Sequence, residues 1–174
     1  MTAAYVYAAV RTPFGKLGGG LAQIRPDDLA AMVLIGLLAK TPGLDPGAID
    51  EVVWGNANGA GEENRNVGRM AVLLAGLPTS VPATTVNRLC GSSLDATMIA
   101  SRTIETGDAE ITIAGGVESM TRAPWVLLKP SRPFPKTTGA TRAPAAPRTC
   151  RSIPPRAIAT TRRTTSASRP STAT

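Results

Sequence analysis

Cys90 is the side chain in this sequence best suited to covalent chemistry. It stands in the run Val-Asn-Arg-Leu-Cys-Gly-Ser-Ser-Leu-Asp-Ala over 86–96, where a predicted strand gives way to a predicted helix. Backbone N–H groups and the dipole at a helix N-terminus favour an anion, and a thiolate is a nucleophilic anion. We expect Gly91 to allow tight backbone geometry beside the thiol, and Ser92 or Ser93 to cap the helix. The alternative is a buried structural cysteine, because free cysteine is among the most buried residue types.

Other patterns in the chain give only weak indications of a binding or catalytic site. The glycine-rich run over 15–20 lacks the Gly-Lys-Ser/Thr ending of a phosphate-binding loop, and the run over 55–61 matches a dinucleotide fingerprint only in part. No group of residues has metal-ligand spacing, since the chain has two cysteines and no histidine. Cys150 lies between Thr149 and Arg151 in a low-complexity segment and is assigned no role. We therefore expect no metal and no cofactor.

The elements that must position Cys90 alternate between strand and helix. Short apolar runs bounded by loops predict four strands, over 6–10, 49–54, 84–86 and 111–114. Longer apolar patterns predict three helices, over 26–40, 66–75 and 91–106. Strands that alternate with helices of this length imply an α/β fold, with a mostly parallel sheet covered on both faces.

The helices differ in their apolar patterns. The first opens on Pro-Asp-Asp, stops at Thr-Pro-Gly over 41–43, and is apolar on several faces, so we expect it to be well buried. The second places Val67, Met70, Ala71 and Leu74 on one face. The third carries small and apolar residues on most sides, as a central buried helix does.

The net charge of +7 belongs to one end of the chain. Residues 1–136 hold 12 basic and 12 acidic residues, whereas 34 of the 38 residues over 137–174 are Thr, Ala, Arg, Pro or Ser. Such a tail buries too little to offset its backbone entropy, so we expect it to be disordered. A solvated basic tail, a nucleic-acid arm and the product of a frameshift over 125–137 are the three readings. The lack of aromatic residues among the arginines argues against the second.

Location follows from simple counts. The longest apolar run, over 29–39, is shorter than the roughly 20 residues that a membrane span needs. The N-terminus has no basic region before an apolar stretch, which argues against a signal peptide. Two cysteines in unlike surroundings suggest no disulfide framework. We expect a cytoplasmic protein that binds neither membrane nor nucleic acid.

The sequence resembles the thiolase family in four motifs that stand in order over about residues 4–128. They are Arg-Thr-Pro-Phe-Gly over 11–15, the segments 64–70 and 73–78, the cysteine motif Asn-Arg-Leu-Cys-Gly-Ser-Ser over 87–93, and Ala-Gly-Gly-Val-Glu-Ser-Met-Thr-Arg-Ala-Pro over 114–124. Within these motifs, the segment Asn-Arg-Asn-Val over 64–67 resembles that of thiolases that cleave β-ketoadipyl-CoA. One departure is Gly59, where many relatives carry glutamine.

The resemblance implies a fold and a reaction. A thiolase has two similar halves in a five-layered αβαβα structure, of which residues 1–130 would form an incomplete first half and 131–174 the tail. Cys90 would accept the acyl group from a coenzyme A thioester, in 3-ketoacyl-CoA thiolysis or acetyl-CoA condensation. Its backbone N–H would help to hold the oxyanion. Intact members are expected to be homodimers or homotetramers that act in pathways such as fatty acid metabolism.

The resemblance also implies what the chain would lack on its own. In thiolases a histidine of the second half activates the cysteine, a second cysteine there moves a proton, and a lid-like loop domain holds coenzyme A. None of these is expected in this chain, so we predict a truncated enzyme without turnover. The alternatives are a non-catalytic fragment, a partner of an intact paralogue, or a β-ketoacyl synthase-like condensing enzyme.

Overall fold

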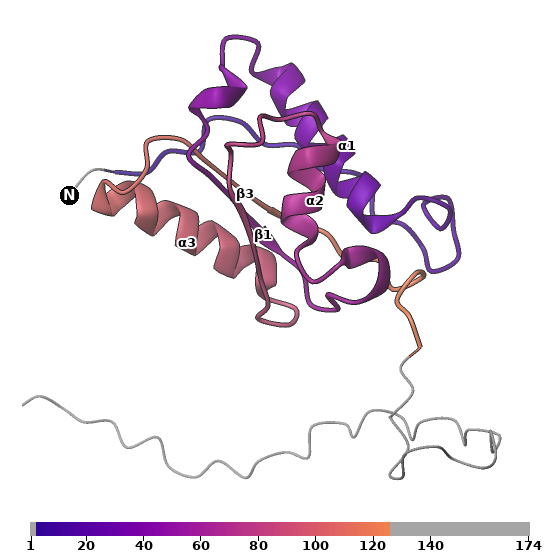
Figure 1. Ribbon diagram of the computed structural model, residues 1–174. Coiled ribbons are helices and arrows are strands. Elements are labelled where there is room, and N and C mark those ends of the chain that lie inside the picture. Colours follow the sequence, from indigo (N-terminus) through magenta and orange to yellow (C-terminus); the bar gives the residue numbers. More distant parts are fainter. Residues whose placement is uncertain (1–2, 126–174) are drawn as a thin grey trace, which may run out of the picture. The chain divides into compact units, whose positions relative to one another are not determined.

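The computed structural model describes residues 3–125, which form three strands, three α-helices and two short 3-10 helices (Figure 1). In chain order the elements are α1 (Pro26–Lys40), η1 (Pro46–Ala48), β1 (Glu51–Gly55), η2 (Gly61–Glu63), α2 (Val67–Leu74), β2 (Ala83–Val86), α3 (Ser92–Thr106) and β3 (Thr112–Gly116). The expectations for the tail over 131–174, including its disorder and its possible frameshift origin, lie outside the described residues. No helix in the described part of the chain is long and apolar enough to span a bilayer.

The sheet is parallel, with the order β2-β1-β3. Val52 pairs with Ala83 on one side of β1 and with Ile113 on the other. Because the strands run the same way, their carboxyl ends at Gly55, Val86 and Gly116 lie side by side at one end of the sheet, which we call its carboxyl edge. The predicted α/β class is confirmed, as are three of the four predicted strands.

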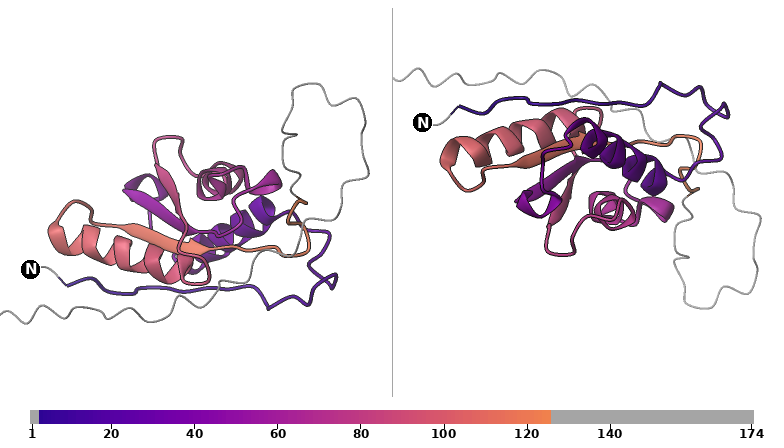
Figure 2. Two further views of the ribbon diagram at one scale, coloured as in Figure 1. Left: turned by 90° about the horizontal axis from the view of Figure 1, so that it is seen from below. Right: turned by 90° about the horizontal axis from the view of Figure 1, so that it is seen from above.

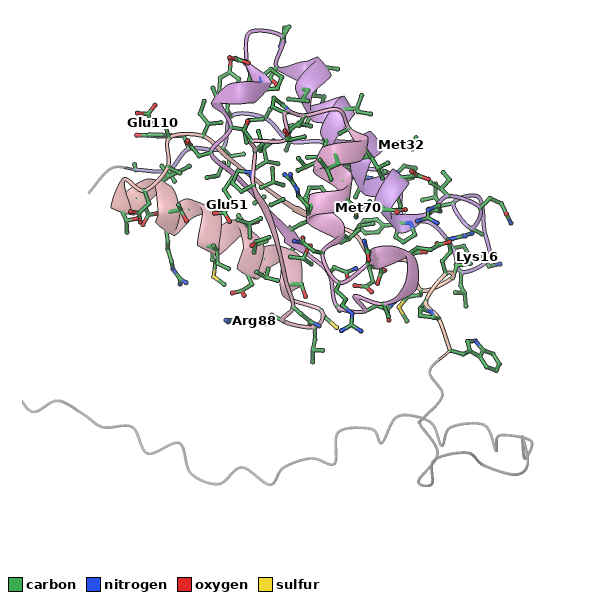
Figure 3. The ribbon with its side chains drawn as sticks, in the orientation of Figure 1. Lys16, Met32, Glu51, Met70, Arg88 and Glu110 are labelled. Atoms are coloured by element: carbon green, nitrogen blue, oxygen red, sulfur yellow. The ribbon has the colours of Figure 1, made fainter. Side chains whose placement is uncertain are left out.

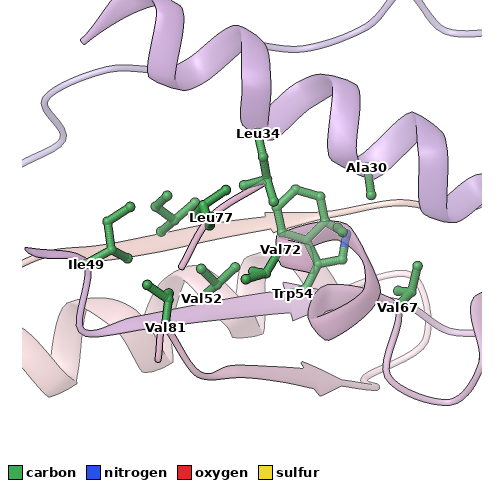
Figure 4. Packing of buried hydrophobic residues seen from close by; sticks show 11 residues of the cluster. Ala30, Leu34, Ile49, Val52, Trp54, Val67, Val72, Leu77 and Val81 are labelled. Carbon is green, nitrogen blue, oxygen red and sulfur yellow. The ribbon is translucent and has the colours of Figure 1, made fainter. Parts of the chain in front are cut away.

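Helices cover both faces of the sheet. Alternate residues of β1 point to opposite sides, so Val52 and Trp54 join one buried cluster and Val53 joins another. The first cluster includes residues of α1 and α2, and the second includes Ala96 and Ala100 of α3. Figure 1 accordingly shows α1 and α2 on one side of the strands and α3 on the other. In Figure 4 the indole of Trp54 lies beneath Leu34 of α1 at the centre of the larger cluster.

The ends of α1 follow its sequence. Pro26 occupies the first turn, Asp27 and Asp28 face the positive end of the helix dipole, and Lys40 lies in the last turn. Both predicted ends are confirmed, but the predicted burial is only partly right. Ala30, Ala31 and Leu34 are buried, whereas Met32 is 55% exposed, because one face alone contacts α2 and the sheet.

The second helix begins where predicted but buries a different face. Asn66 is the N-cap residue, and its side chain accepts a hydrogen bond from the backbone N–H of Arg69. Val67, Ala71 and Val72 are buried, whereas Leu74 is 47% exposed. The prediction for Leu74 was wrong, because the helix ends at that residue and its last turn extends past the contact with the core.

The predicted strand over 6–10 is not a strand in this structure. Tyr7 is 92% exposed, and Figure 2 shows this N-terminal segment as an extended trace outside the sheet. Within residues 3–125 the sheet consists of β2, β1 and β3, and the segment 6–10 pairs with neither outer strand, so it forms no ladder of hydrogen bonds. The segment instead contacts α1 where Lys40 Nζ donates to the carbonyl oxygen of Ala9, at 3.2 Å.

Candidate active site at the carboxyl edge of the sheet

Cys90 lies in the loop that joins β2 to α3, at the edge where the three strands end. Its position between a strand and a helix N-terminus confirms the expectation from sequence. Its side chain is free and exposed, so the reading of a buried structural cysteine was wrong. A thiol in this place is accessible to a substrate or a reagent from solvent.

A tight turn over 87–92 holds Cys90. The Ser92 hydroxyl accepts from the backbone N–H of Arg88 at 2.9 Å and donates to the carbonyl oxygen of Leu89 at 2.6 Å. The N–H of Gly91 donates to the carbonyl oxygen of Arg88 at 3.1 Å. Leu89 has φ 51°, a left-handed conformation that is uncommon for a non-glycine residue. These three hydrogen bonds therefore fix the backbone on both sides of the thiol.

The residues around the thiol do not play the parts that sequence suggested. Gly91 is the N-cap of α3, and its φ of −95° is open to any residue. Neither Ser92 nor Ser93 caps the helix; the buried Ser92 side chain turns back into the loop instead. The left-handed position is Leu89, which no glycine signal marked.

Arg88 is tied to the first turn of α3. Its guanidinium nitrogen Nη2 lies 3.2 Å from Asp95 Oδ1, and the Asp95 carboxylate is largely buried. Asp95 is also bound through its backbone, since its N–H donates to the carbonyl oxygen of Gly91. The ion pair therefore links a residue near the start of the turn to the helix that follows it.

Two glycines let α3 sit directly on the ends of β1 and β3. A Cβ atom on Gly55 would lie 2.4 Å from the nitrogen of Ser93. One on Gly116 would lie 1.9 Å from Ser93 Oγ and 2.7 Å from the backbone oxygen of Gly55. Real Cβ atoms do not approach that closely, so both positions require glycine. Sequence reasoning missed this requirement, although a glycine at the end of each of two strands was the available signal.

The third helix is buried on one face only. Ser92, Asp95, Ala96 and Ala100 are buried, while Leu94 is 66% exposed. The expectation that this helix is covered on most sides was wrong for the described part of the chain, because only the sheet packs against it.

An ionic cluster joins the segment after β3 to the loop after β1. Arg122 donates to both carboxylate oxygens of Glu62 and to the carbonyl oxygen of Ala22. The hydrogen bond from Arg122 lowers the pKa of Glu62 and raises the pKa of Arg122 itself. These residues line a hollow of about 440 Å³, and Cys90 is not among its lining residues. The cluster therefore fastens loops beside the site and does not contact the thiol.

A second ion pair extends this cluster to the start of α1. Arg25 Nη2 lies 2.7 Å from Asp27 Oδ2 and its Nη1 lies 3.6 Å from Glu62 Oε1. Burial raises the pKa of Asp27, but the hydrogen bonds from Arg25 and from the backbone N–H of Asp28 outweigh it, so the net pKa is lowered. Within residues 3–125, no three His, Cys, Asp or Glu side chains are grouped so as to hold a metal ion. Cys150 lies outside the described residues.

Residues 4–143 match the family "Thiolase, N-terminal domain". The chain is 56% identical over 137 residues to a β-ketoadipyl-CoA thiolase of Acinetobacter baylyi, covering 79% of this chain and 34% of that protein. It is also 56% identical over 134 residues to a 3-oxoadipyl-CoA/3-oxo-5,6-dehydrosuberyl-CoA thiolase of Escherichia coli, covering 77% and 33%. A crystal structure of the Bacillus anthracis acetyl-CoA acetyltransferase superposes with a TM-score of 0.65 at 38% identity, covering 70% of this chain and 30% of that one. The chain thus spans about a third of the length of the relatives it matches.

Proposed function

Because the chain belongs to the thiolase family, we propose that Cys90 is the nucleophile of an acyl transfer between coenzyme A thioesters. The observation that carries the proposal is the exposed thiol on a fixed strand-to-helix turn. That turn follows a strand of a parallel sheet, a common location for sites in α/β folds. The family match supports a thiolase over a β-ketoacyl synthase-like enzyme.

The proposed reaction begins with the Cys90 thiolate. It attacks the carbonyl carbon of an acyl-CoA, the new Sγ–C bond forms, and the carbonyl oxygen carries the negative charge. The bond from that carbon to the coenzyme A sulfur then breaks, and coenzyme A leaves and takes up a proton. For a 3-ketoacyl-CoA, the thiolate attacks the keto carbon instead. The bond between the α and β carbons then breaks, and acetyl-CoA leaves once its carbanion gains a proton.

The substrate class that we propose is a 3-oxoacyl-CoA whose far end carries a carboxylate. This choice is supported by the names of the β-ketoadipyl-CoA and 3-oxoadipyl-CoA thiolases, each 56% identical to this chain. We propose that the whole protein is a cytoplasmic homodimer or homotetramer, in keeping with the expectation from sequence.

The chain by itself supplies the nucleophile but no imidazole base, because none of its 174 residues is histidine. Helix-dipole stabilisation of an anion contributes only about 0.3–1 kcal/mol. A general base in contrast contributes a rate factor of about 10²–10⁴. We therefore propose that the 174-residue chain accepts an acyl group slowly at Cys90 and does not turn over.

The test uses acetyl-CoA and the purified 174-residue chain. We expect the tryptic peptide over 89–102, which contains Cys90, to gain the mass of one acetyl group, and Cys90→Ala to gain none. We also expect no steady formation of acetyl-CoA when 3-oxoadipyl-CoA and coenzyme A are supplied together. An unlabelled wild-type peptide would exclude Cys90 as the acyl acceptor. Turnover that disappears in Cys90→Ser would show instead that the chain is active alone.

A further inference from the structure

Glu118 lies two residues after β3, and its carboxylate binds backbone N–H groups of the loop that follows β1. Glu118 Oε2 accepts from the N–H of Ala57 at 2.8 Å, and Oε1 accepts from the N–H of Asn58 at 3.1 Å. Bonds from backbone N–H groups to a carboxylate are about twice as strong as those between neutral groups. The carboxylate therefore anchors two successive residues of the loop.

The same loop is bound from its other side by the residue that follows β2. Asn87 Nδ2 donates to the carbonyl oxygen of Ala57 at 2.8 Å. That oxygen and the N–H of Asn58 belong to one peptide group, so Glu118 and Asn87 hold this group at its two ends. All three strand ends are thereby joined through the Ala57–Asn58 peptide.

Asn87 carries the connection on to the turn of Cys90. Its Oδ1 accepts from the N–H of Leu89 at 2.9 Å, and Leu89 is the left-handed residue directly before Cys90. An unbroken series of hydrogen bonds thus runs from Glu118 through the Ala57–Asn58 peptide and Asn87 to Leu89. A left-handed leucine is unfavourable without such support.

We infer that Glu118 is a positioning residue for Cys90 and that it acts through Asn87. The inference rests on the proposed function, in which Cys90 is the reacting group. Glu118 does not take part in the chemistry; it fixes the loop against which the Asn87 side chain is braced. Asn87 then holds the backbone of Leu89 and, with it, the thiol at the start of α3.

The protein contains a matched control for this contact. Asp50, just before β1, also accepts from two successive backbone N–H groups, those of Glu110 at 2.8 Å and Ile111 at 3.0 Å. It does so where the strands begin, and Figure 3 shows Glu110 and Arg88 towards opposite ends of the sheet. Asp50 therefore has the chemistry of the Glu118 contact without its connection to Cys90.

The experiment compares alkylation of Cys90 by iodoacetamide in four variants of the 174-residue chain. These are Glu118→Ala, Asn87→Ala, the double variant of both, and Asp50→Ala. Mass spectrometry of the tryptic peptide over 89–102 gives the rate constant for Cys90 separately from Cys150. We expect Glu118→Ala and Asn87→Ala each to lower the rate about two- to fivefold, the factor that the field of a helix N-terminus contributes.

The double variant tests whether the two residues act in one series. We expect its rate to equal that of either single variant, since residues in one network are not additive. We expect Asp50→Ala to alkylate at the wild-type rate. An unchanged rate in Glu118→Ala, an equal loss in Asp50→Ala, or multiplied losses in the double variant would each overturn the inference.

Two further measurements separate a positioning role of Glu118 from a loss of folding, and separate the inference from the proposed function. Glu118→Gln retains one acceptor oxygen, so its rate should lie between those of the wild type and Glu118→Ala, and it serves if the alanine variant does not fold. A Glu118→Gln rate equal to that of the wild type counts against the inference. Acetylation of wild-type Cys90 by acetyl-CoA tests the proposed function alone, because the iodoacetamide comparison does not depend on it.

Discussion

Gly55 of β1 and Ser93 of α3 meet backbone to backbone, since a Cβ atom on Gly55 would lie 2.4 Å from the Ser93 nitrogen. The position of Cys90 relative to the sheet depends on this contact, because α3 begins two residues after Cys90. Any side chain at position 55 must push the first turn of the helix away from the strand.

Gly55→Ala is therefore expected to destabilise the fold by about 1–3 kcal/mol, the usual effect of overpacking. It should also lower the rate at which Cys90 is alkylated. Gly36→Ala in α1 is the control, because nothing lies within 4 Å of its added Cβ. That change should stabilise the protein by about 0.5–1 kcal/mol. Urea unfolding of both variants measures the difference; equal effects would mean that α3 does not rest on Gly55.

Gly91→Ala is expected to be tolerated, in contrast to the expectation from sequence. Its φ of −95° suits alanine, and the nearest neighbour of the added Cβ, the carbonyl oxygen of Arg88, lies at an ordinary 3.5 Å. The cost should stay near that of a weaker N-cap, about 1 kcal/mol or less. Urea unfolding and alkylation of the variant check this; loss of the folded state would restore a special role for Gly91.

Ser92→Ala should destabilise the turn around Cys90, whereas Ser93→Ala should not. The first change removes the partner of both the Arg88 N–H and the Leu89 carbonyl. We expect it to lower the free energy of unfolding by about 1–3 kcal/mol. Ser93 is exposed, so its replacement should stay within about 0.5 kcal/mol. Amide hydrogen exchange over 88–92 provides a local measurement, and equal exchange in the two variants would contradict the assigned role of Ser92.

Acid should weaken the fold through Asp27, Asp50 and Glu62. Each has a lowered pKa. Burial raises the pKa of Asp27, but the hydrogen bonds from Arg25 and Asp28 outweigh it; the backbone N–H groups of Ile111 and Glu110 lower that of Asp50, and Arg122 lowers that of Glu62. A carboxyl group whose folded pKa lies below its unfolded pKa adds stability above the unfolded pKa, near 4. That stability is lost as the pH falls through the folded pKa.

Urea unfolding at pH 7 and at about pH 3 measures this loss. In Glu62→Gln the drop between the two pH values should be smaller than in the wild type, because one of the contributing carboxyl groups is gone. If the free energy of unfolding falls by the same amount in the variant, Glu62 does not contribute to the acid sensitivity of the fold.

Glu63 is expected to be replaceable with a gain in stability. It is 1% exposed, and neither carboxylate oxygen has a hydrogen-bond partner among the described residues. A buried carboxylate without a partner is costly, so Glu63→Met should raise the free energy of unfolding by about 1 kcal/mol or more. The same change at the exposed Glu110 should stay within about 0.5 kcal/mol. A loss of stability in Glu63→Met would show that the carboxylate is needed.

Sequence was sufficient to place Cys90, because the change from a strand pattern to a helix pattern at 86–92 marks where the chain turns. It was not sufficient for the strand over 6–10, since an apolar run indicates a segment that can be buried but not which strand edge is free. The left-handed conformation of Leu89 was also beyond prediction, because leucine gives no turn signal. The roles of Gly55 and Gly116 appear only once α3 is folded over the sheet.

The anchoring of the β1 loop has a consequence for how this region can change between related proteins. Glu118 and Asn87 grip the loop at Ala57 solely through its peptide atoms, so the methyl group of Ala57 makes none of these bonds. Residue types other than proline therefore keep the backbone groups that these bonds need, since proline would lack the N–H that donates to Glu118. The side chains that fix the position of the loop at Ala57 are Asn87 and Glu118, which lie thirty and sixty-one positions after Ala57 in the sequence.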